Sequence, residues 1–449
     1  MNQAGVVECA SAIFLFRDHD ALETLSSIAD FILCHNREII IPQDDSLIQF
    51  SKKYKKRIIL RRSRGYAPSF EFETFNFEKD KMVLALGSDL KSTFAFNSSG
   101  NTYISQYLGD LSFYDNHINF EYCLHHLTGL LDFKPTVIAI DKHPEFTSVC
   151  LGETLAKESN ISLIRIQHHE AHFAAVLAEN KLLVKKEAVL GIIWDGLGFG
   201  NHNNICGGEF LLYYDTQIST VAQIEPFQHI TGDRMSTEPA ISALSVCNGI
   251  EGADGILEKK FTKTEWEIYK KLFNTKINVT TSSMGRIFDA VASLLGLCDK
   301  ISYEGEAAIL LETLAKTDSD LFQLPGYTLD IINDINIPLK GIIRQLIADI
   351  NNGIAKERIA AQFHVTLVKM IENTANHFSI SNIAFSGGVF QNSLLIDLII
   401  EKLSGSYELH FHQHLSPNDE CISFGQLAWV MIHDTNKQSS VNNSLEKTI

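Results

Sequence analysis

The chain has 449 residues, 45% of them hydrophobic and 20% charged, a globular balance that excludes collagen-like, coiled-coil and wholly disordered proteins. Its net charge of −16, from 38 basic and 54 acidic residues, argues against nucleic acid as the main partner, since an acidic surface repels phosphate backbones. No apolar run approaches the roughly 20 residues that span a bilayer, and the first residues lack a signal-peptide pattern. Eight scattered cysteines without a C-x-x-C pair exclude a zinc ribbon and predict thiols in a cytoplasmic protein.

Residues 9–66 form a first block along the chain. A helix is predicted over 20–34, followed by strand-like segments at 38–42 and 58–60. The block is too short for an ordinary domain core. Its basic run over 52–64 fits a solvated hairpin as well as a site for an anionic ligand. Residues 68–81 are interpreted as a linker.

From Met82 onward, short apolar runs alternate with helical patterns. The runs are short and rich in β-branched residues, which favours buried strands covered by helices and hence an α/β architecture. Long helical patterns occupy 257–297 and 342–377, and the polar tail over 434–449 is predicted to be disordered. The predicted strands lie at 83–86, 137–140, 163–166, 189–194, 210–214 and 383–385.

A cluster of histidines, QHHEAH at 167–172, directly follows one predicted strand. On a helix His168 and His172 project from one face a turn apart, and two such imidazoles can hold a transition metal. His169 is expected to point elsewhere. Histidine pairs at this spacing also occur by chance on helix surfaces, so both interpretations stay open for this stretch alone.

Three of the predicted strands end in glycine turns. Such turns let the backbone approach an anion closely, and a carboxylate at a strand's carboxyl end faces the crevice where α/β sheets bind ligands. A tight capping turn is the alternative for each one taken singly. Together they predict two lobes that close on a phosphate-bearing ligand. The turn residues are Asp195, Gly196, Gly198 and Gly200, then Ser386, Gly387 and Gly388, and finally Gly87, Ser88, Asp89 and Lys91.

Two further residues have plain structural interpretations. Asp419, in a turn before a predicted helix, is favoured as a helix cap on sequence alone. Cys206 stands beside two glycines but is interpreted as a buried spectator, because nothing nearby clearly lowers its pKa.

Several phrases occur in order: HHEAH, WDGLGFG…CGGEF, SMGRIFDAVASLLGL, SYEGEAA, SGGVFQN and PNDECISFGQ. With RRSRGYAP and DKHPEF upstream, they resemble the Kae1-like carbamoyltransferase region of the HypF family, which matures nickel–iron hydrogenases. The resemblance implies a two-lobed α/β fold of the actin-like, Hsp70-like ATPase type. It also implies a partial YrdC-like remnant over 1–70, lobe I over 71–187 and lobe II over 188–433, followed by the tail over 434–449.

The resemblance implies a specific set of site residues. One divalent metal ion, iron or zinc, is expected on His168, His172, Asp195 and Asp419. ATP or AMP, as carbamoyl adenylate, is expected between the lobes. Lys91 and Asp195 are the expected catalytic residues. The expected nucleotide-binding residues are Gly196, Gly198, Gly200, Glu304, Ser386, Gly387, Gly388 and Asn392.

In the family, the carbamoyl group passes to the C-terminal cysteine of a HypE-like partner. This sequence departs from the family pattern, because the acylphosphatase domain, the zinc fingers and most of the YrdC-like domain are missing. We therefore expect carbamoyl adenylate to come from elsewhere, for example from a complete YrdC-like protein. Glu420 and Cys421 stand where the family has two small residues, and the extra carboxylate is expected either to bind the metal or to repel the anionic intermediate.

Three other functions are weighed against this one. A tRNA threonylcarbamoyl transferase shares the histidine pair but conflicts with the acidic charge. A small-molecule O-carbamoyltransferase places its YrdC-like part after the Kae1-like part, whereas here the remnant comes first. A non-catalytic paralogue that binds nucleotide or a partner is favoured by the shortened front and by the altered neighbours of Asp419.

Overall fold

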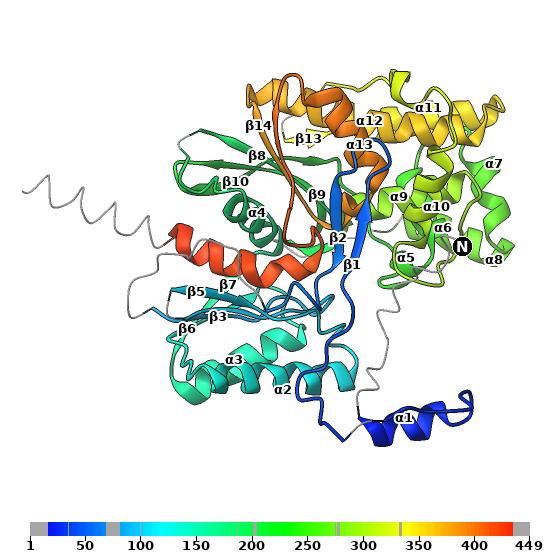
Figure 1. Ribbon diagram of the computed structural model, residues 1–449. Helices are drawn as coiled ribbons and strands as arrows, with labels where there is room; N and C mark the ends of the chain where they lie inside the picture. Colours follow the sequence, from blue (N-terminus) through cyan, green and yellow to red (C-terminus); the bar gives the residue numbers. More distant parts are fainter. Residues whose placement is uncertain are drawn as a thin grey trace, which may run out of the picture.

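The computed structural model describes residues 17–433, except 35, 69–80, 99, 186, 201–203, 274, 276–278 and 332–334. Two β-sheets with their helices form two lobes, one above the other in Figure 1. The expected two-lobed α/β architecture is confirmed. The predicted tail and nearly all of the predicted linker lie outside the described residues. Among the described helices, none combines the length and apolarity needed to cross a membrane.

The first lobe is built on a five-stranded sheet in the order β5-β4-β3-β6-β7. β3, β6 and β7 run parallel, and β6 is buried along its whole length, which explains its uninterrupted apolar sequence. Two helices, α2 (Tyr114–Leu130) and α3 (Thr147–Ser159), pack on one face. The strands are β3 (Val83–Ala85), β4 (Ala95–Ser98), β5 (Asn101–Ile104), β6 (Val137–Asp141) and β7 (Ser162–Ile166).

The second lobe is built on an eight-stranded sheet, with β8 between β9 and β14 near its centre. β14 runs parallel to β8, so their carboxyl ends meet at one edge. The helices α9, α12 and α13 belong to its core. The strands are β8 (Val189–Phe199), β9 (Ile205–Tyr214), β10 (Gln217–Ile224), β11 (Phe227–Gln228), β12 (Thr280–Thr281), β13 (Asn336–Ile337), β14 (Asn382–Ser386) and β15 (Glu408–His410).

Most helices of the second lobe gather at one end of its sheet (Figure 1). The predicted helical stretch over 257–297 is divided into several helices, with the short strand β12 between them. The stretch over 342–377 is divided near Gly353, which has a positive φ that continues no helix. The helices are α5 (Arg234–Thr237), α6 (Pro239–Val246), α7 (Asp254–Leu257), α8 (Lys263–Phe273), α9 (Met284–Leu294), α10 (Glu306–Ala315), α11 (Lys340–Asn351), α12 (Lys356–Phe378) and α13 (Ser393–Leu403), with 3-10 turns at Glu258–Lys260, Leu321–Gln323, Gly388–Gln391 and Asp419–Cys421.

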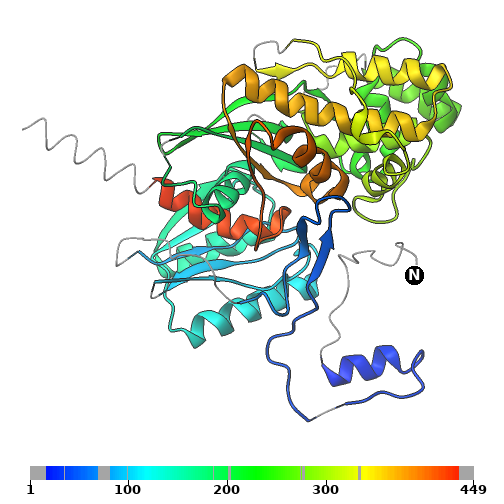
Figure 2. The same cartoon turned by 45° about the horizontal axis from the view of Figure 1, so that its top comes forward.

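Two helices lie between the sheets: α4 (His168–Glu179) and the helix at residues 422–433 (Figures 1 and 2). One side of this pair shares a core with the first sheet, through residues such as Ala171 and Phe424. The other side packs on the second sheet, through residues such as Phe173 and Ala428. A side chain at Gly425 would collide with the Ala171 carbonyl, so this glycine lets the two helices touch. The pair thereby connects the cores of both lobes.

The N-terminal block differs from its prediction. The helix predicted over 20–34 is only α1 (Asp18–Leu25), and it buries no residue. Ile28 and Phe31 are 78% and 95% exposed, so among the described residues the apolar pattern has no packing partner, and short helices need one. The strand predicted at 38–42 is irregular, whereas that at 58–60 is β2 (Arg57–Arg61), paired with β1 (Leu47–Phe50).

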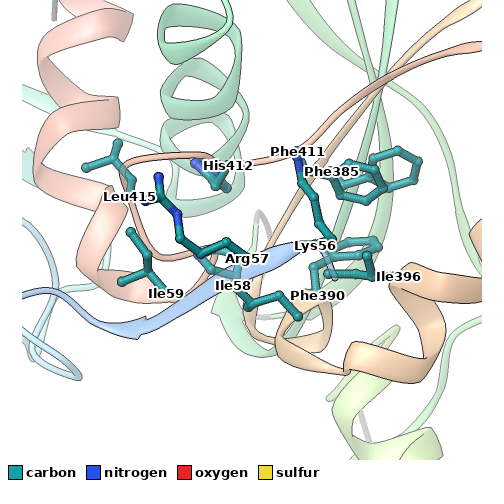
Figure 3. A pocket seen from close by; sticks show the side chains of 11 residues that line it. Lys56, Arg57, Ile58, Ile59, Phe385, Phe390, Ile396, Phe411, His412 and Leu415 are labelled. Atoms are coloured by element: carbon teal, nitrogen blue, oxygen red, sulfur yellow. The ribbon is translucent and has the colours of Figure 1, made fainter. Parts of the chain in front are cut away.

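The β1–β2 hairpin packs on the two-lobed body. At its tip, Lys53 N and Tyr54 N donate to the Asp397 carboxylate, at 2.7 and 3.0 Å. Farther along, Asn418 Nδ2 donates to the Leu60 carbonyl at 3.0 Å. The cavity left beneath β2 in Figure 3 is about 10 Å³, room for one water molecule. The hairpin is therefore seated closely, and this cavity is too small for a nucleotide.

Candidate active site and metal centre

The histidine pair opens helix α4, directly after β7. Gln167 caps the helix, its side chain accepting a hydrogen bond from Glu170 N at 2.8 Å. His168 and His172 are both buried, with ring centroids 5.0 Å apart, as two residues one helical turn apart should be. The predicted helical placement of the pair is therefore what the structure has.

Two carboxylates approach this pair from other parts of the chain. Asp195 comes from β8 and Asp419 from the turn before helix 422–433. Asp195 Oδ2 lies 3.6 and 3.5 Å from Nε2 of His168 and His172, and Asp419 Oδ1 lies 3.8 and 3.7 Å from the same atoms. The structure thus brings together all four residues expected to bind a metal.

The surroundings of these four groups fit a divalent ion. Nε2 of each histidine is buried and, among the described residues, makes no hydrogen bond. One ligand atom from each of the four residues lies within 4.8 Å of the others. Two imidazoles and two carboxylates suit zinc or iron, both of which accept nitrogen and oxygen ligands.

The shifted pKa values of the four side chains also favour the binding of a cation. Burial opposes charge on every group, yet Asp419 and two other carboxylates raise the pKa of His168 well above its usual value. Burial likewise opposes ionisation of Asp195, but both imidazoles hold the pKa of its carboxyl well below the usual range. Without a metal, the carboxylates are ionised and the imidazoles hold protons. A bound cation would replace those protons.

The far sides of both imidazoles are also fixed. His168 Nδ1 lies 2.9 Å from Asp141 Oδ2, at the end of β6. His172 Nδ1 lies 3.0 Å from Ser386 Oγ and 3.3 Å from Cys421 Sγ. Such partners orient a ligand ring and set its tautomer. Each Nε2 is consequently aimed at the carboxylates.

A further chain of buried groups continues behind His172. Ser386 Oγ lies 2.9 Å from His412 Nε2, and His412 Nδ1 lies 2.6 Å from Glu179 Oε2. Burial disfavours the Cys421 thiolate, but His172 and His412 outweigh it and lower the pKa of Cys421 to about 6. Burial disfavours charge on His412 as well, but Cys421 and Glu179 raise its pKa to about 9. His172 Nδ1 therefore contacts a buried hydrogen-bonded network that contains the Cys421 thiol and, through Ser386 and His412, the Glu179 carboxylate.

The glycine turns of the second lobe meet at Asp195. Gly388 N donates to Asp195 Oδ1 at 3.1 Å. Gly387 has φ +107°, and a side chain there would collide with the Trp194 backbone, so only glycine fits. Gly196 lies against Gly285, close enough that a side chain on Gly285 would reach its Cα within 2.8 Å. Both turns are therefore next to the candidate metal ligands.

The glycine turn of the first lobe, residues 87–91, also borders the four candidate metal ligands. Ser88 Oγ lies 3.3 Å from Asp419 Oδ2. Lys91 is 8% exposed and its ammonium pairs with both oxygens of Glu304, at 2.7 and 2.8 Å. Asp89 accepts hydrogen bonds from Thr147 N and Ser148 N, so it caps α3. Of this turn, Ser88 borders the metal ligands and Lys91 is held by the other lobe.

Three other residues expected at the site, Asn392, Gly198 and Gly200, make contacts within the fold. Asn392 caps α13 through Leu395 N, and its amide lies 3.1 Å from His364 Nε2. Gly198 lies against the ring of His169, and Gly200 against Cys206. Asn392 is therefore engaged in contacts within the fold, and of the GLGFG glycines Gly198 lies beside a third histidine, His169.

Glu420 does not join the metal ligands, contrary to one expectation for it. Its Oε2 accepts a hydrogen bond from Arg62 N at 2.8 Å. Arg62 is itself buried, and burial lowers its pKa to about 10 although Glu420 raises it. Asp419 faces the two histidines and Glu420 does not, because they are successive residues of a 3-10 turn and their side chains point in different directions. Asn418, rather than Asp419, caps that turn.

Three buried groups of the site were missed by sequence reasoning: Asp141, Glu179 and His412. The sequence does contain a signal for Asp141, because this residue directly follows the apolar run 137–140, just as Asp195 follows the apolar run 189–194. Glu179 and His412 had none, because they meet only through the fold, 233 residues apart in sequence.

Comparisons with known proteins show the family of this chain. Residues 78–179 match the family model of the HypF Kae1-like domain, and residues 191–426 match that of the carbamoyltransferase Kae1-like domain, second subdomain. The chain is 33% identical to "Carbamoyltransferase HypF" of Synechocystis over 95% of its own length and 56% of the relative. It is 29% identical to a "Carbamoyltransferase HypF homolog" of Cupriavidus necator, covering 78% of this chain and 91% of that protein.

A solved structure is similar as well. It is described as full-length HypF in the phosphate- and nucleotide-bound form, and it superimposes with a TM-score of 0.83 at 31% identity. The match covers 92% of this chain and 54% of that one. The chain therefore spans about half the length of most of the HypF proteins it matches.

Proposed function

Because the chain belongs to the HypF family, of which it spans the Kae1-like region, we propose that it transfers a carbamoyl group from carbamoyl adenylate to a cysteine thiol of a HypE-like partner. One observation carries this proposal: four candidate metal-ligand side chains from three separate segments meet at one point, where Nε2 of both imidazoles is buried and makes no hydrogen bond among the described residues. Glycine turns of both lobes border the same point. On this proposal, the β1–β2 hairpin serves as a docking element on the two-lobed body, and the protein works in the cytoplasm.

The step we propose is an acyl transfer. The acceptor thiolate attacks the carbamoyl carbon, a sulfur–carbon bond forms, and the carbon–oxygen bond to the phosphate breaks. The electron pair leaves on the phosphate oxygen and AMP departs. No residue of this chain needs to become covalently modified, because the acceptor supplies the nucleophile.

The metal ion, zinc or iron, would be held by His168, His172, Asp195 and Asp419. When bound, such an ion supplies Lewis-acid polarisation of a carbamoyl or phosphate oxygen. The protein contributes orientation: Asp141 fixes the ring of His168, and Ser386 fixes that of His172.

Lys91 is proposed to stabilise the charge that develops on the departing phosphate. It lies near the site and is held by Glu304, so it would exchange this carboxylate for phosphate when the nucleotide enters. Nucleotide binding by this chain is supported by the nucleotide-bound HypF structure that it resembles. We place the adenylate between the turns that contain Gly198 and Gly387.

A second candidate function is a paralogue that binds nucleotide or partner without turnover. It is supported by Glu420 and Cys421, which stand beside Asp419 where small residues were expected, and by the contact of Cys421 with His172. RNA-directed transfer is disfavoured by the net charge of −16.

The test uses the purified full chain with carbamoyl adenylate and a peptide that ends in cysteine. We expect mass spectrometry to detect the thiocarbamate on the peptide, and serine in place of that cysteine to abolish it. The chain alone is expected not to exchange pyrophosphate into ATP; adding a complete YrdC-like protein should replace the supplied adenylate. Nucleotide binding without any transfer would favour the second candidate.

A further inference from the structure

A second group of possible metal ligands lies beside the first, on the other face of α4. It consists of His169, Cys206 and Glu209. One ligand atom from each of these residues lies within 4.8 Å of the others. None of the three belongs to the four-residue centre, so the function proposed above leaves them unexplained.

His169 carries the main argument. It is only 1% exposed, and among the described residues neither ring nitrogen makes a hydrogen bond. Its Nδ1 nevertheless lies 3.1 Å from Glu209 Oε2. Two ligand atoms on one zinc ion, each about 2 Å from it, are separated by about this distance. A buried imidazole without hydrogen bonds loses free energy unless something binds it.

The backbone places Cys206 and Glu209 on the same side of β9. They are three residues apart and would point to opposite faces of a regular strand. The pairing of β9 with β8 is irregular, however, since Trp194 pairs with Gly208 and the next pair is Gly198 with Cys206. The extra residues of this irregularity lie on β8, and the ligand atoms of Cys206 and Glu209 both lie within 4.8 Å of one on His169.

Further contacts hold the group in place. Glu209 Oε2 accepts a hydrogen bond from Gly207 N at 2.7 Å, and its Oε1 accepts one from the Ser282 hydroxyl. Gly198 packs against the His169 ring on its Nε2 side, where a side chain would collide with it. This leaves Nδ1 as the nitrogen that faces the group. Hydrogen-bonded carboxylates and a fixed ring are typical of metal ligands.

We propose that His169 Nδ1, the Cys206 sulfur and Glu209 Oε2 bind a second divalent cation of the zinc class. Thiolate with imidazole selects zinc over magnesium or calcium, and three protein ligands leave a fourth position open. On binding, the thiol loses its proton to solvent. The ion would tie α4 to the β8–β9 hairpin, next to the GLGFG turn.

Cobalt(II) offers a direct test, because it substitutes for zinc and a thiolate ligand gives a near-ultraviolet charge-transfer band. The four-residue centre contains no sulfur. Titration of the metal-free full chain should therefore produce this band, and metal analysis should find two ions per chain. Cys206→Ser should remove the band and one ion, whereas Cys298→Ser, a matched half-buried thiol outside both groups, should remove neither.

A double variant His168→Asn/His172→Asn separates the two sites, since it should lose one ion and keep the band. Glu209→Gln, which preserves shape, covers the case in which the Cys206 variant fails to fold. Zinc should also protect Cys206 from alkylation, as read by peptide mapping. One ion per chain without a thiolate band, or a band that disappears with Cys421→Ser instead, would overturn the proposal.

Discussion

The sulfur of Cys421 lies 3.3 Å from Nδ1 of His172, while Nε2 of the same ring faces Asp195 Oδ2 at 3.5 Å. One imidazole therefore separates a low-pKa thiol from the candidate metal position. The thiol acts on the metal only through the ring, by orienting it and by making its Nε2 a better donor. Cys421 is thus a positioning residue rather than a ligand.

The first prediction concerns the partners of that ring. Ser386→Ala removes the hydroxyl that contacts His172 Nδ1 and should weaken metal binding about 10–100-fold. Competition with a chromogenic chelator measures the affinity. Ser242→Ala, which removes an equally buried serine that donates to the Met235 carbonyl, is the control and should leave the affinity unchanged. Equal affinities for all three proteins would show that Ser386 does not position His172.

A second prediction tests Asp141. Asp141→Asn keeps the size of the side chain but removes the negative charge beside His168 Nδ1, so the imidazole loses the partner that sets its tautomer. We expect metal affinity to fall by about the same factor of 10–100. The variant should still fold, as judged by circular dichroism. Unchanged metal content after dialysis against chelator would contradict this role.

The third prediction is a pH dependence of stability. His412 titrates at about 9 in the folded protein against 6.5 ordinarily, so folding favours its proton. The stabilisation from its pair with Glu179 is therefore complete below about pH 6.5 and is lost as the pH rises to about 9. Cys421 titrates in the opposite sense, with a pKa of about 6 in the fold against 9.0 ordinarily, so its contribution rises over the same range and offsets this loss in the wild type. Thermal unfolding from about pH 6 to 9.5 should therefore isolate the His412 contribution as the difference between the wild type and a variant without the Glu179 carboxylate.

Glu179→Gln provides the comparison. It should lower stability by about 3–5 kcal/mol near neutral pH, because the partner charge stays buried. Because the Cys421 contribution remains, the stability of this variant should rise relative to the wild type between about pH 6.5 and 9. Parallel curves for the two proteins would assign the pH dependence to other groups.

A fourth prediction concerns the β1–β2 hairpin. Glu420→Ala leaves the buried Arg62 without its nearest anion and removes a hydrogen bond to its backbone. Amide hydrogen exchange across residues 47–61 should accelerate about tenfold or more, because removing the carboxylate partner of a buried charge costs several kcal/mol. Glu401→Ala removes an exposed ion pair with Lys53, worth under about 1 kcal/mol, and an exposed hydrogen bond from the Tyr54 hydroxyl, and is the control for a surface contact of the same hairpin. Identical exchange in both variants would refute the anchoring role of Glu420.

The sequence predicts much of this fold because its strongest signals are local. Apolar runs such as 137–140 and 189–194 are buried strands, and the spacing of His168 and His172 places both on one face of a helix. Contacts between distant segments leave no such signal. The pairing of Glu420 with Arg62, the approach of Glu179 to His412 and the position of helix 422–433 between two sheets all depend on packing. α1 is shorter than its apolar pattern predicts, because no part of the chain that the structure describes covers that face.

The central claim is that the four-residue centre supports carbamoyl transfer. The most direct measurement is the single-turnover rate of transfer from carbamoyl adenylate to a cysteine-ended peptide, with zinc or iron restored to metal-free protein. We expect metal to restore transfer in the wild type and in His117→Asn, which replaces a half-buried histidine on α2 that pairs with Glu121. His172→Asn and Asp195→Asn should bind less metal and lose transfer by about 100-fold or more. Full transfer by metal-free protein, or by either of these two variants, would contradict the account.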